Sequence, residues 1–422
     1  MNLAELKEKI KEFQYMEDTG VIDVVLAGIL STRLSLGSPV WLIIIGASSG
    51  GKTQILRPLT MTDDKFIFPV DDLTPNTLLS GANVGKGKSG SLLDRIGKKG
   101  IIAISDLTVL FSKANEARDE ILAAFRMLYD GHYTKNVGNK AEALSWHGQI
   151  GIIAGSTPSV YSHFESVADM GERFIYYRMR EYDSLAATRI AMSREIYGEE
   201  LNQKLCGYYT EYLKNVMELY SCLQLPAMPR AFEDRIIRVA VLTEKIRTTA
   251  RVDWQGNMNK LPVSAYPMRL SLQMRSIARG LQIMRLVEGE ELGPEDSKIL
   301  DWCGYSLANE EKRACLRKLC ERPFDSWIKT QTVSDLVGLD ETVIQPILQN
   351  LSAIGIVARS GNAQSGHGWR MASEDDWKLI REIEGIERFV ATEVTKEPEV
   401  ITSAEEPEQV NLDFMGKGWD KD

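Results

Sequence analysis

Eight consecutive residues have the types and spacing needed to hold the phosphates of a nucleotide. The stretch GASSGGKT (46–53) fits the pattern G-x-x-x-x-G-K-[ST] and follows the apolar run WLIII. Glycines let backbone N–H groups curl around an anion, the lysine neutralises the β and γ phosphates, and the threonine hydroxyl can ligate Mg²⁺. A glycine-rich turn without a ligand is the alternative. The pattern predicts an ATP and Mg²⁺ site, called here the phosphate loop, made of Gly46, Ala47, Ser48, Ser49, Gly50, Gly51, Lys52 and Thr53.

A second metal ligand is expected from Asp106, which ends the apolar run in GIIAISDLTVL. A carboxylate at this position emerges at the edge of a parallel sheet, beside the phosphate loop. Such sites usually hold a pair of acids, whereas here Ser105 precedes a single acid. Asp106 either holds Mg²⁺ through water or polarises the attacking water while Ser105 takes the metal side, and both hypotheses stay open. An aspartate that merely ends a strand is the structural alternative.

Two more segments carry polar candidates for catalysis. Ser156 and Thr157 follow the apolar run in GQIGIIAGSTPS, where a polar residue lies close to the γ-phosphate of many nucleotide-driven motors. Arg173, in MGERFIYYRMR, begins another predicted strand. Arginine is always charged and suits a contact with the transferring phosphoryl group of a neighbouring subunit. A plain strand end and a surface ion pair are the respective alternatives.

The elements that must position these residues follow from the pattern of apolar residues. A helical lead-in over 3–35 precedes a segment in which short apolar runs alternate with helical patterns, as a parallel sheet requires. We therefore predict an α/β protein with four regions. They are an α/β core at 1–180, a helical lid at 181–308, a winged-helix domain at 309–372 and an acidic disordered tail at 373–422.

The third region has the pattern of a winged helix. Helices are predicted at RACLRKLCERP, VSDLVGL and DETVIQPILQNLSAIGIV, and the glycine-rich ARSGNAQSGHGWRM predicts a hairpin wing. Arg359, His367 and Arg370 in this wing can contact a DNA backbone. Because the third helix is poor in basic residues, a contact with protein or a regulatory role is the alternative.

Composition and charge bound the class of protein. A chain of 422 residues that is 44% hydrophobic and 26% charged is typical of a soluble globular protein. Residues 373–422 hold fifteen acidic and six basic residues, which accounts for the whole net charge of −9. The rest of the chain is neutral, so its composition is compatible with nucleic-acid binding.

Cysteine usage and the apolar runs predict a cytoplasmic protein. The five cysteines contain no C-x-x-C pair and the four histidines lack metal spacing, so neither a disulfide framework nor a zinc site is expected. The start, MNLAELKEKIKEF, predicts an amphipathic helix rather than a signal peptide. The run VWLIIIGA is too short to cross a membrane, so we expect no membrane partner.

The order of these motifs resembles one known family. The phosphate loop, the single-acid strand, the small-small-polar-polar-Pro strand, the GERF arginine and a later P-x-R-L are similar to AAA+ ATPases of the minichromosome-maintenance-like group. The likeness is closest to replication ATPases of phages and mobile elements and covers roughly residues 20–372. It implies that Thr157 takes the sensor 1 position, Arg173 is the arginine finger, and Arg269 in AYPMRLSLQ is the sensor 2 arginine of the lid.

The same resemblance implies a homo-oligomeric ring, expected as a hexamer, that works as an ATP-driven DNA helicase or translocase. A helicase loader or an ATP-gated DNA-binding regulator that does not unwind DNA is the alternative. The predicted hairpin YTKNVGNK would bring Lys135 and Lys140 to a central pore, and Lys86 and Lys88 in NVGKGKSGS would belong to an insert on the same side. Lysines there would bind phosphates without regard to base sequence, and a solvated hairpin is the alternative.

The acidic tail carries a motif that resembles a clamp-binding peptide. Gln409, Leu412 and Phe414 occupy the fixed positions of Q-x-x-L-x-F, by which bacterial replication proteins dock on the sliding clamp. A disordered strand can present the leucine and phenylalanine to an apolar pocket while the glutamine amide hydrogen-bonds at its rim. The tail therefore predicts the clamp as a partner and a bacterial host cytoplasm as the location. A tail that folds back on the ATPase body is the alternative.

Overall fold

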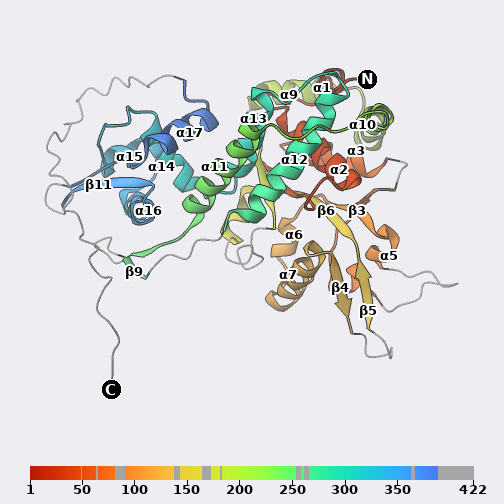
Figure 1. Cartoon of the computed structure of the whole chain (residues 1–422), viewed down its shortest axis with the longest axis horizontal. Coiled ribbons are helices and arrows are strands. Elements are labelled where there is room, and N and C mark those ends of the chain that lie inside the picture. Colours follow the sequence, from red (N-terminus) through yellow and green to blue (C-terminus); the bar gives the residue numbers. More distant parts are fainter. Residues whose placement is uncertain are drawn as a thin grey trace. The chain divides into compact units, whose positions relative to one another are not determined.

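A computed structural model describes residues 1–48, 50–62, 65–80, 91–136, 143–163, 173–180, 183–252, 258–260, 266–362 and 366–387 of the chain. The chain folds into two compact units (Figure 1). The first comprises Met1–Ala250 and Leu261–Arg313, and the second comprises Arg251–Lys260 and Ala314–Asp422. The predicted α/β core and most of the predicted lid thus belong to one unit.

The first unit is built on a five-stranded parallel sheet. Its strands are, in spatial order, β2 (Ile67–Pro69), β3 (Lys99–Ile104), β6 (Gln149–Ser156), β1 (Trp41–Ile45) and β7 (Ile175–Arg178). All four neighbouring pairs run parallel. The α/β class and the parallel sheet predicted from the sequence are confirmed.

Strand β1 shows how the ends of the strands are aligned. Its five residues are all buried, as expected for a parallel strand that is covered on both faces. Its last residue, Ile45, is level with Ser156 of β6 and Arg178 of β7, whereas Leu42 is level with Ile175. The carboxyl ends of these three strands therefore meet at one edge of the sheet, and the start of β7 lies toward the other.

Helices precede, connect and cover the strands. Up to β7 they are α1 (Leu3–Lys11), α2 (Gly20–Leu34), α3 (Lys52–Thr60), α4 (Pro75–Leu78), α5 (Leu92–Ile96), α6 (Thr108–Phe111), α7 (Asn115–Tyr129) and the 3-10 helix η1 (Pro158–His163). The apolar α2 is buried along nearly its whole length and contacts β1, β3 and β6. After α7, β4 (His132–Lys135) and β5 (Leu144–His147) pair antiparallel, and the turn of the predicted YTKNVGNK hairpin lies outside the described residues.

The region after β7 is helical, as its periodicity predicts. It contains α9 (Ser184–Ser193), α10 (Gly198–Tyr220), α11 (Arg230–Arg247), α12 (Met268–Leu286) and α13 (Pro294–Tyr305). Figure 1 shows α11, α12 and α13 side by side, and α12 also packs on α2. Arg285 of α12 binds Asp23 of α2 at 3.1 Å and Asp296 of α13 at 2.8 Å. This buried ion cluster fixes the predicted lid to the N-terminal helices.

The second unit combines short helices with a small antiparallel sheet. Its elements are β8 (Arg251–Val252), β9 (Met258–Lys260), β10 (Ile328–Lys329), α15 (Thr330–Val337), α16 (Glu341–Ala353), β11 (Val357–Asn362), β12 (Gly366–Met371) and α17 (Glu374–Glu384). Helix α14 (Glu310–Cys320) starts in the first unit and ends in the second. The sheet has the order β10-β12-β11. Trp369 of β12 is fully buried and donates its indole N–H to Thr330 at 2.8 Å.

The expectation of disorder from residue 373 onward is wrong for its first part. Residues Glu374–Glu384 form α17, whose N-cap Ser373 accepts a hydrogen bond from the Asp376 N–H. Leu379, Ile380 and Ile383 of this helix are buried, so apolar packing outweighs its acidic composition. The rest of the tail from 388 lies outside the described residues. Among the helices that the structure describes, none is long and apolar enough to cross a membrane.

Candidate nucleotide-binding site

The phosphate loop connects β1 to α3, as predicted. Gly51 is the N-cap of α3 and has a φ of 83°, a left-handed conformation that glycine adopts without steric cost. A Cβ atom on Gly51 would lie 1.9 Å from Nε2 of Gln14, so this position also has no room for a side chain. The described loop residues are therefore held together in the predicted strand-to-helix turn, and Ser49 lies outside the described residues.

Lys52 is the first residue of α3 and is buried, with 9% of its surface exposed. Its Nζ donates hydrogen bonds to the carbonyls of Gly46 at 2.8 Å and Ala47 at 2.6 Å. Burial lowers the pKa of the Lys52 ammonium, and the charge of Asp106 raises it. The ammonium therefore lies inside the loop within the electrostatic reach of the predicted metal ligand.

The first turn of α3 suits an anion. It contains no acidic residue, and no side chain caps the backbone N–H groups at this helix end. Uncapped N–H groups and the helix dipole together attract negative charge. With the buried ammonium of Lys52 beside them, these groups fit a phosphate, and the exposed hydroxyl of Thr53 is an oxygen ligand of the kind Mg²⁺ prefers.

Asp106 lies just after β3 and is exposed. Its Oδ1 accepts hydrogen bonds from the Thr108 N–H at 2.9 Å and the Thr108 hydroxyl at 2.6 Å. The next residue, Leu107, donates its N–H to the carbonyl of Gly155 in β6 at 2.7 Å. These bonds fix the carboxylate at the carboxyl end of the sheet, and they leave both hypotheses for its role open.

Thr157 follows β6 at the same edge. The Gly46 N–H donates to the carbonyl of Ser156 at 3.2 Å, so the phosphate loop and the end of β6 are directly joined. The hydroxyls of Thr157 and Ser159 share a hydrogen bond of 2.7 Å. Because β3, β6 and β1 are neighbours, Asp106, Thr157 and Lys52 are brought together at one edge of the sheet. Carboxyl ends of parallel strands are where ligands usually bind.

Arg173 and Arg269 lie at the opposite, amino edge. Arg173 precedes β7, and the ring of the next residue, Phe174, lies 5.1 Å from that of Trp41 at the start of β1. Gln273 of α12 accepts a hydrogen bond from the Trp41 N–H at 3.1 Å, which places Arg269, one turn earlier in α12, near the same edge. At about 3.3 Å per residue, the length of β1 puts Arg173 roughly 15–20 Å from the phosphate loop of its own chain.

The two arginines are neighbours. Arg173 is 7% exposed, binds Asp130 at 3.2 Å and stacks over the ring of Tyr129 with 5.6 Å to its centre. Burial lowers the pKa of the Arg173 guanidinium, the charge of Arg269 lowers it further, and Asp130 raises it. Burial likewise raises the pKa of Tyr129 to about 12. Tyr129 and Asp130 were not predicted from the sequence, where their only signal is the helix end LYDG.

Gln14 also contacts the phosphate loop and was not predicted from the sequence. It is 4% exposed and donates from Nε2 to the carbonyl of Gly51 at 3.2 Å. Its Oε1 is buried without a hydrogen-bond partner among the described residues. No local pattern marks this glutamine, because its contact joins residues 37 positions apart.

The predicted DNA-contacting residues lie in both units. Lys135 of β4 donates to Asn76 at 2.8 Å. In the second unit, Arg359 stacks over Trp369 at 5.8 Å and Arg370 over Trp327 at 4.8 Å. Both arginines therefore use their planar faces on aromatic rings of their own unit. Outside the described residues or side chains are Lys86, Lys88, Lys140, His367, Gln409, Leu412 and Phe414.

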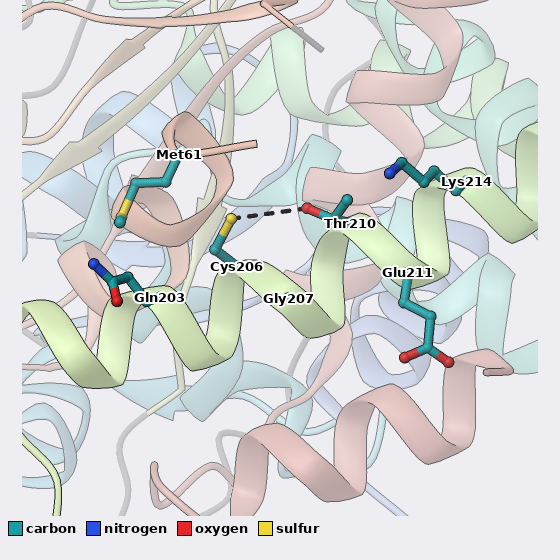
Figure 2. A pocket seen from close by; sticks show the side chains of 7 residues that line it. All are labelled: Met61, Gln203, Cys206, Gly207, Thr210, Glu211 and Lys214. Carbon is teal, nitrogen blue, oxygen red and sulfur yellow. Dashed lines mark hydrogen bonds between the residues drawn. The ribbon is translucent and has the colours of Figure 1, made fainter. Parts of the chain in front are cut away.

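A cavity of about 450 Å³ lies over α10, outside the predicted site. Figure 2 shows its lining residues, among them Cys206 and Thr210, whose sulfur and hydroxyl lie 3.7 Å apart. None of the lining residues was predicted to act in catalysis or binding. No protein-family model matches the chain, and no curated protein matches it in sequence.

Proposed function

We propose that the chain is a ring-forming AAA+ ATPase that acts as a DNA helicase or translocase in the replication of a phage or mobile element. The observation that carries the proposal is the division of charged and polar residues between the two edges of the parallel sheet. Lys52, Asp106 and Thr157 lie at the carboxyl edge, and Arg173 with Arg269 lies at the amino edge.

At the carboxyl edge, each residue has a role in handling ATP. The loop N–H groups and Lys52 hold the phosphates, while Thr53 and Asp106 hold Mg²⁺. The metal would neutralise charge on the phosphate oxygens. Thr157 orients the reacting groups at the γ-phosphate. The Lys52 ammonium has three N–H groups, of which two donate to the carbonyls of Gly46 and Ala47, so a third is available to a phosphate oxygen.

At the amino edge, the two arginines are too far from their own phosphate loop to act there. A nucleotide that they contact must belong to a neighbouring subunit. Such a contact is head to tail, and a head-to-tail contact that closes on itself gives a ring. The arrangement therefore supports the arginine-finger role of Arg173 and extends the same role in trans to Arg269.

The second unit is proposed as a winged-helix domain, with β11 and β12 as its wing. Three helices followed by a hairpin in a three-stranded sheet support this identification. A second candidate function, an ATP-gated loader or regulator that does not unwind DNA, is favoured by the stacking of Arg359 and Arg370 on aromatic rings. We further propose that Gln409, Leu412 and Phe414 bind the sliding clamp in a bacterial cytoplasm.

ATP turnover by purified variants tests the proposal. Lys52→Ala should lower ATP hydrolysis at least a hundredfold, and Thr53→Ala should weaken Mg²⁺-dependent nucleotide binding. Lys113→Ala is the matched control and should keep full activity. It breaks an ion pair with Asp72, which follows β2, the edge strand that β3 and β6 separate from β1. Undiminished turnover by Lys52→Ala would exclude the proposed site. Strand displacement on forked DNA separates the helicase from the loader.

A further inference from the structure

Two helices of the first unit expose a continuous apolar surface. On α11, Ile237 and Val241 are 50% and 47% exposed, and on α12, Met268 and Leu272 are 68% and 47% exposed. Each pair is spaced four residues apart and so lies on one helix face. These four residues are named the α11–α12 strip.

The two halves of the strip adjoin each other. Glu233 of α11 binds Arg275 of α12 at 3.3 Å. Arg279 of α12 donates to the carbonyl of Pro226, just before α11, so the two helices run antiparallel. Ile237 lies one turn beyond Glu233, and Leu272 lies one turn before Arg275. The strip therefore continues from this ion pair toward the start of α12, where Arg269 lies.

A second exposed surface lies on α9 and the start of α10. Helix α9 has no buried residue, which is unusual for a helix of ten residues with apolar side chains. Leu185, Met192 and Tyr197 are 58%, 79% and 58% exposed. They are named the α9–α10 corner. Only five residues separate the end of β7, at the phosphate-loop edge, from α9, so the corner begins on that side of the unit.

The two surfaces have an opposite excess of charge. Beside the strip, three arginines are exposed with one acid, and beside the corner, four acids are exposed with one base. The strip residues are Arg238, Arg269, Arg275 and Asp234, and the corner residues are Asp183, Glu195, Glu199, Glu200 and Arg189. Glu199 has only a loose partner, Arg57 at 3.7 Å, and Arg275 has Glu233. Apolar patches with basic and acidic surroundings are complementary to each other, and like charges would oppose pairing of either patch with itself.

We infer that the α9–α10 corner of one copy docks on the α11–α12 strip of the next copy. The inference deepens the proposed function, on which it rests, by naming the surfaces that join subunits. The strip lies beside Arg269 and the corner lies toward the phosphate-loop edge. Docking one on the other brings the arginine pair of one copy toward the nucleotide of its neighbour, and the opposite placement of the surfaces makes the contact head to tail.

Paired substitutions that remove apolar area without adding charge test the inference. The strip variant is Met268→Gln with Leu272→Gln, and the corner variant is Leu185→Gln with Met192→Gln. Glutamine keeps the helices intact. Leu223→Gln, at a position that is 40% exposed and lies outside both surfaces, is the control. Sedimentation velocity with Mg²⁺ and a non-hydrolysable ATP analogue reports assembly, and circular dichroism reports folding.

Wild type and the Leu223 variant should assemble, whereas the strip and corner variants should dissociate roughly tenfold or more readily. An equimolar mixture of the two variants should form a dimer and nothing larger, because one intact strip meets one intact corner. Variants that assemble like wild type, a mixture that stays monomeric, or a monomeric wild type would overturn the inference.

Binding of a fluorescent ATP analogue is measured in parallel. If wild type does not bind the ATP analogue, that result would count against the proposed function. The mixing experiment would still show whether the strip and the corner dock on each other.

Discussion

At the scale of single residues, the phosphate loop depends on close packing between Gly51 and Gln14. The two residues come from segments that are far apart in the sequence, and the glutamine amide occupies the space of a Cβ atom on the glycine. The spacing of the loop was therefore predictable, because it is a local pattern. The packing of Gln14 was not, because it depends on how α1 folds back onto the loop.

Gly51→Ala should destabilise the protein by roughly 2 kcal/mol or more, because it adds a left-handed alanine and a contact with Gln14. Urea denaturation measures the free energy of unfolding. The double variant Gly51→Ala with Gln14→Ala is the control for the contact. The double variant should recover part of the lost free energy of unfolding. About 1 kcal/mol should remain lost, because the left-handed backbone of alanine at position 51 is still strained. Equal losses in the single and double variants would show that Gln14 does not limit this position.

Lys312 is a buried amine that should make stability depend on pH. Its Nζ donates to the carbonyls of Ile246 and Thr248 at the end of α11, at 2.8 and 2.9 Å. Burial lowers its pKa from 10.5 to about 8. Between these values the unfolded chain binds more protons than the folded one, so the free energy of unfolding rises as the pH rises.

We expect Lys312 to contribute a rise of about 3 kcal/mol in the free energy of unfolding between pH 8 and pH 10.5. Below pH 8 the full cost of burying the charged amine is present. Lys312→Met removes the titrating group, so the stability of wild type relative to this variant should increase with pH over that window. Denaturation at several pH values measures the difference. A constant difference would contradict the lowered pKa.

At the scale of elements, the crossing of α2 and α12 depends on a helical glycine. A Cβ atom on Gly280 would lie 2.1 Å from the carbonyl oxygen of Ala27. Because this neighbour is backbone, it cannot rotate away, and the two helices would have to separate. Gly280→Ala should therefore cost about 3 kcal/mol in the free energy of unfolding.

Gly207 of α10 is the matched control for this substitution. It is also a helical glycine, but an added Cβ would meet no atom within 4 Å. Gly207→Ala should raise the free energy of unfolding by about 1 kcal/mol, because alanine is the better helix former. Thermal or urea denaturation of both variants measures the contrast. A similar effect of the two alanines would show that α2 and α12 do not meet at Gly280.

Helices and strands with strong local patterns were predictable from the sequence. Which elements lie next to each other in space was not. The run WLIII and the helices after β7 follow from the spacing of apolar residues. The separation of Arg173 from Lys52 follows instead from the parallel register of β1 and β7, which pairs residues more than 130 positions apart. Helix α17 was missed because acidic composition concealed the spacing of Leu379, Ile380 and Ile383.

At the scale of the whole molecule, the placement of Arg173 predicts how subunits share activity. Arg173→Ala should bind ATP normally and hydrolyse it slowly, at least tenfold below wild type. Mixed with wild type, it should depress turnover below the additive value, because each variant subunit leaves a neighbour's site incomplete. A titration of turnover against the fraction of variant measures this effect.

Asp130→Asn is the control for the mixing experiment. It weakens the ion pair with Arg173 but retains the guanidinium, so mixtures with wild type should be close to additive. Additive turnover for Arg173→Ala as well would indicate that the arginine serves only its own subunit. The experiment thereby separates a shared site from a structural ion pair.

The second unit is not a continuous piece of chain. The backbone passes between the units after Ala250, after Lys260 and after Arg313, and β8 of the inserted segment contacts α16. A gene fusion or recombination event that exchanges everything after residue 313 would therefore transfer a unit without its own β8–β9 ribbon. The recipient chain would keep its own β8–β9 ribbon, which belongs with the unit that was replaced. We therefore expect β8 and α16 to be inherited together, because they contact each other although α16 lies on the far side of the exchange point.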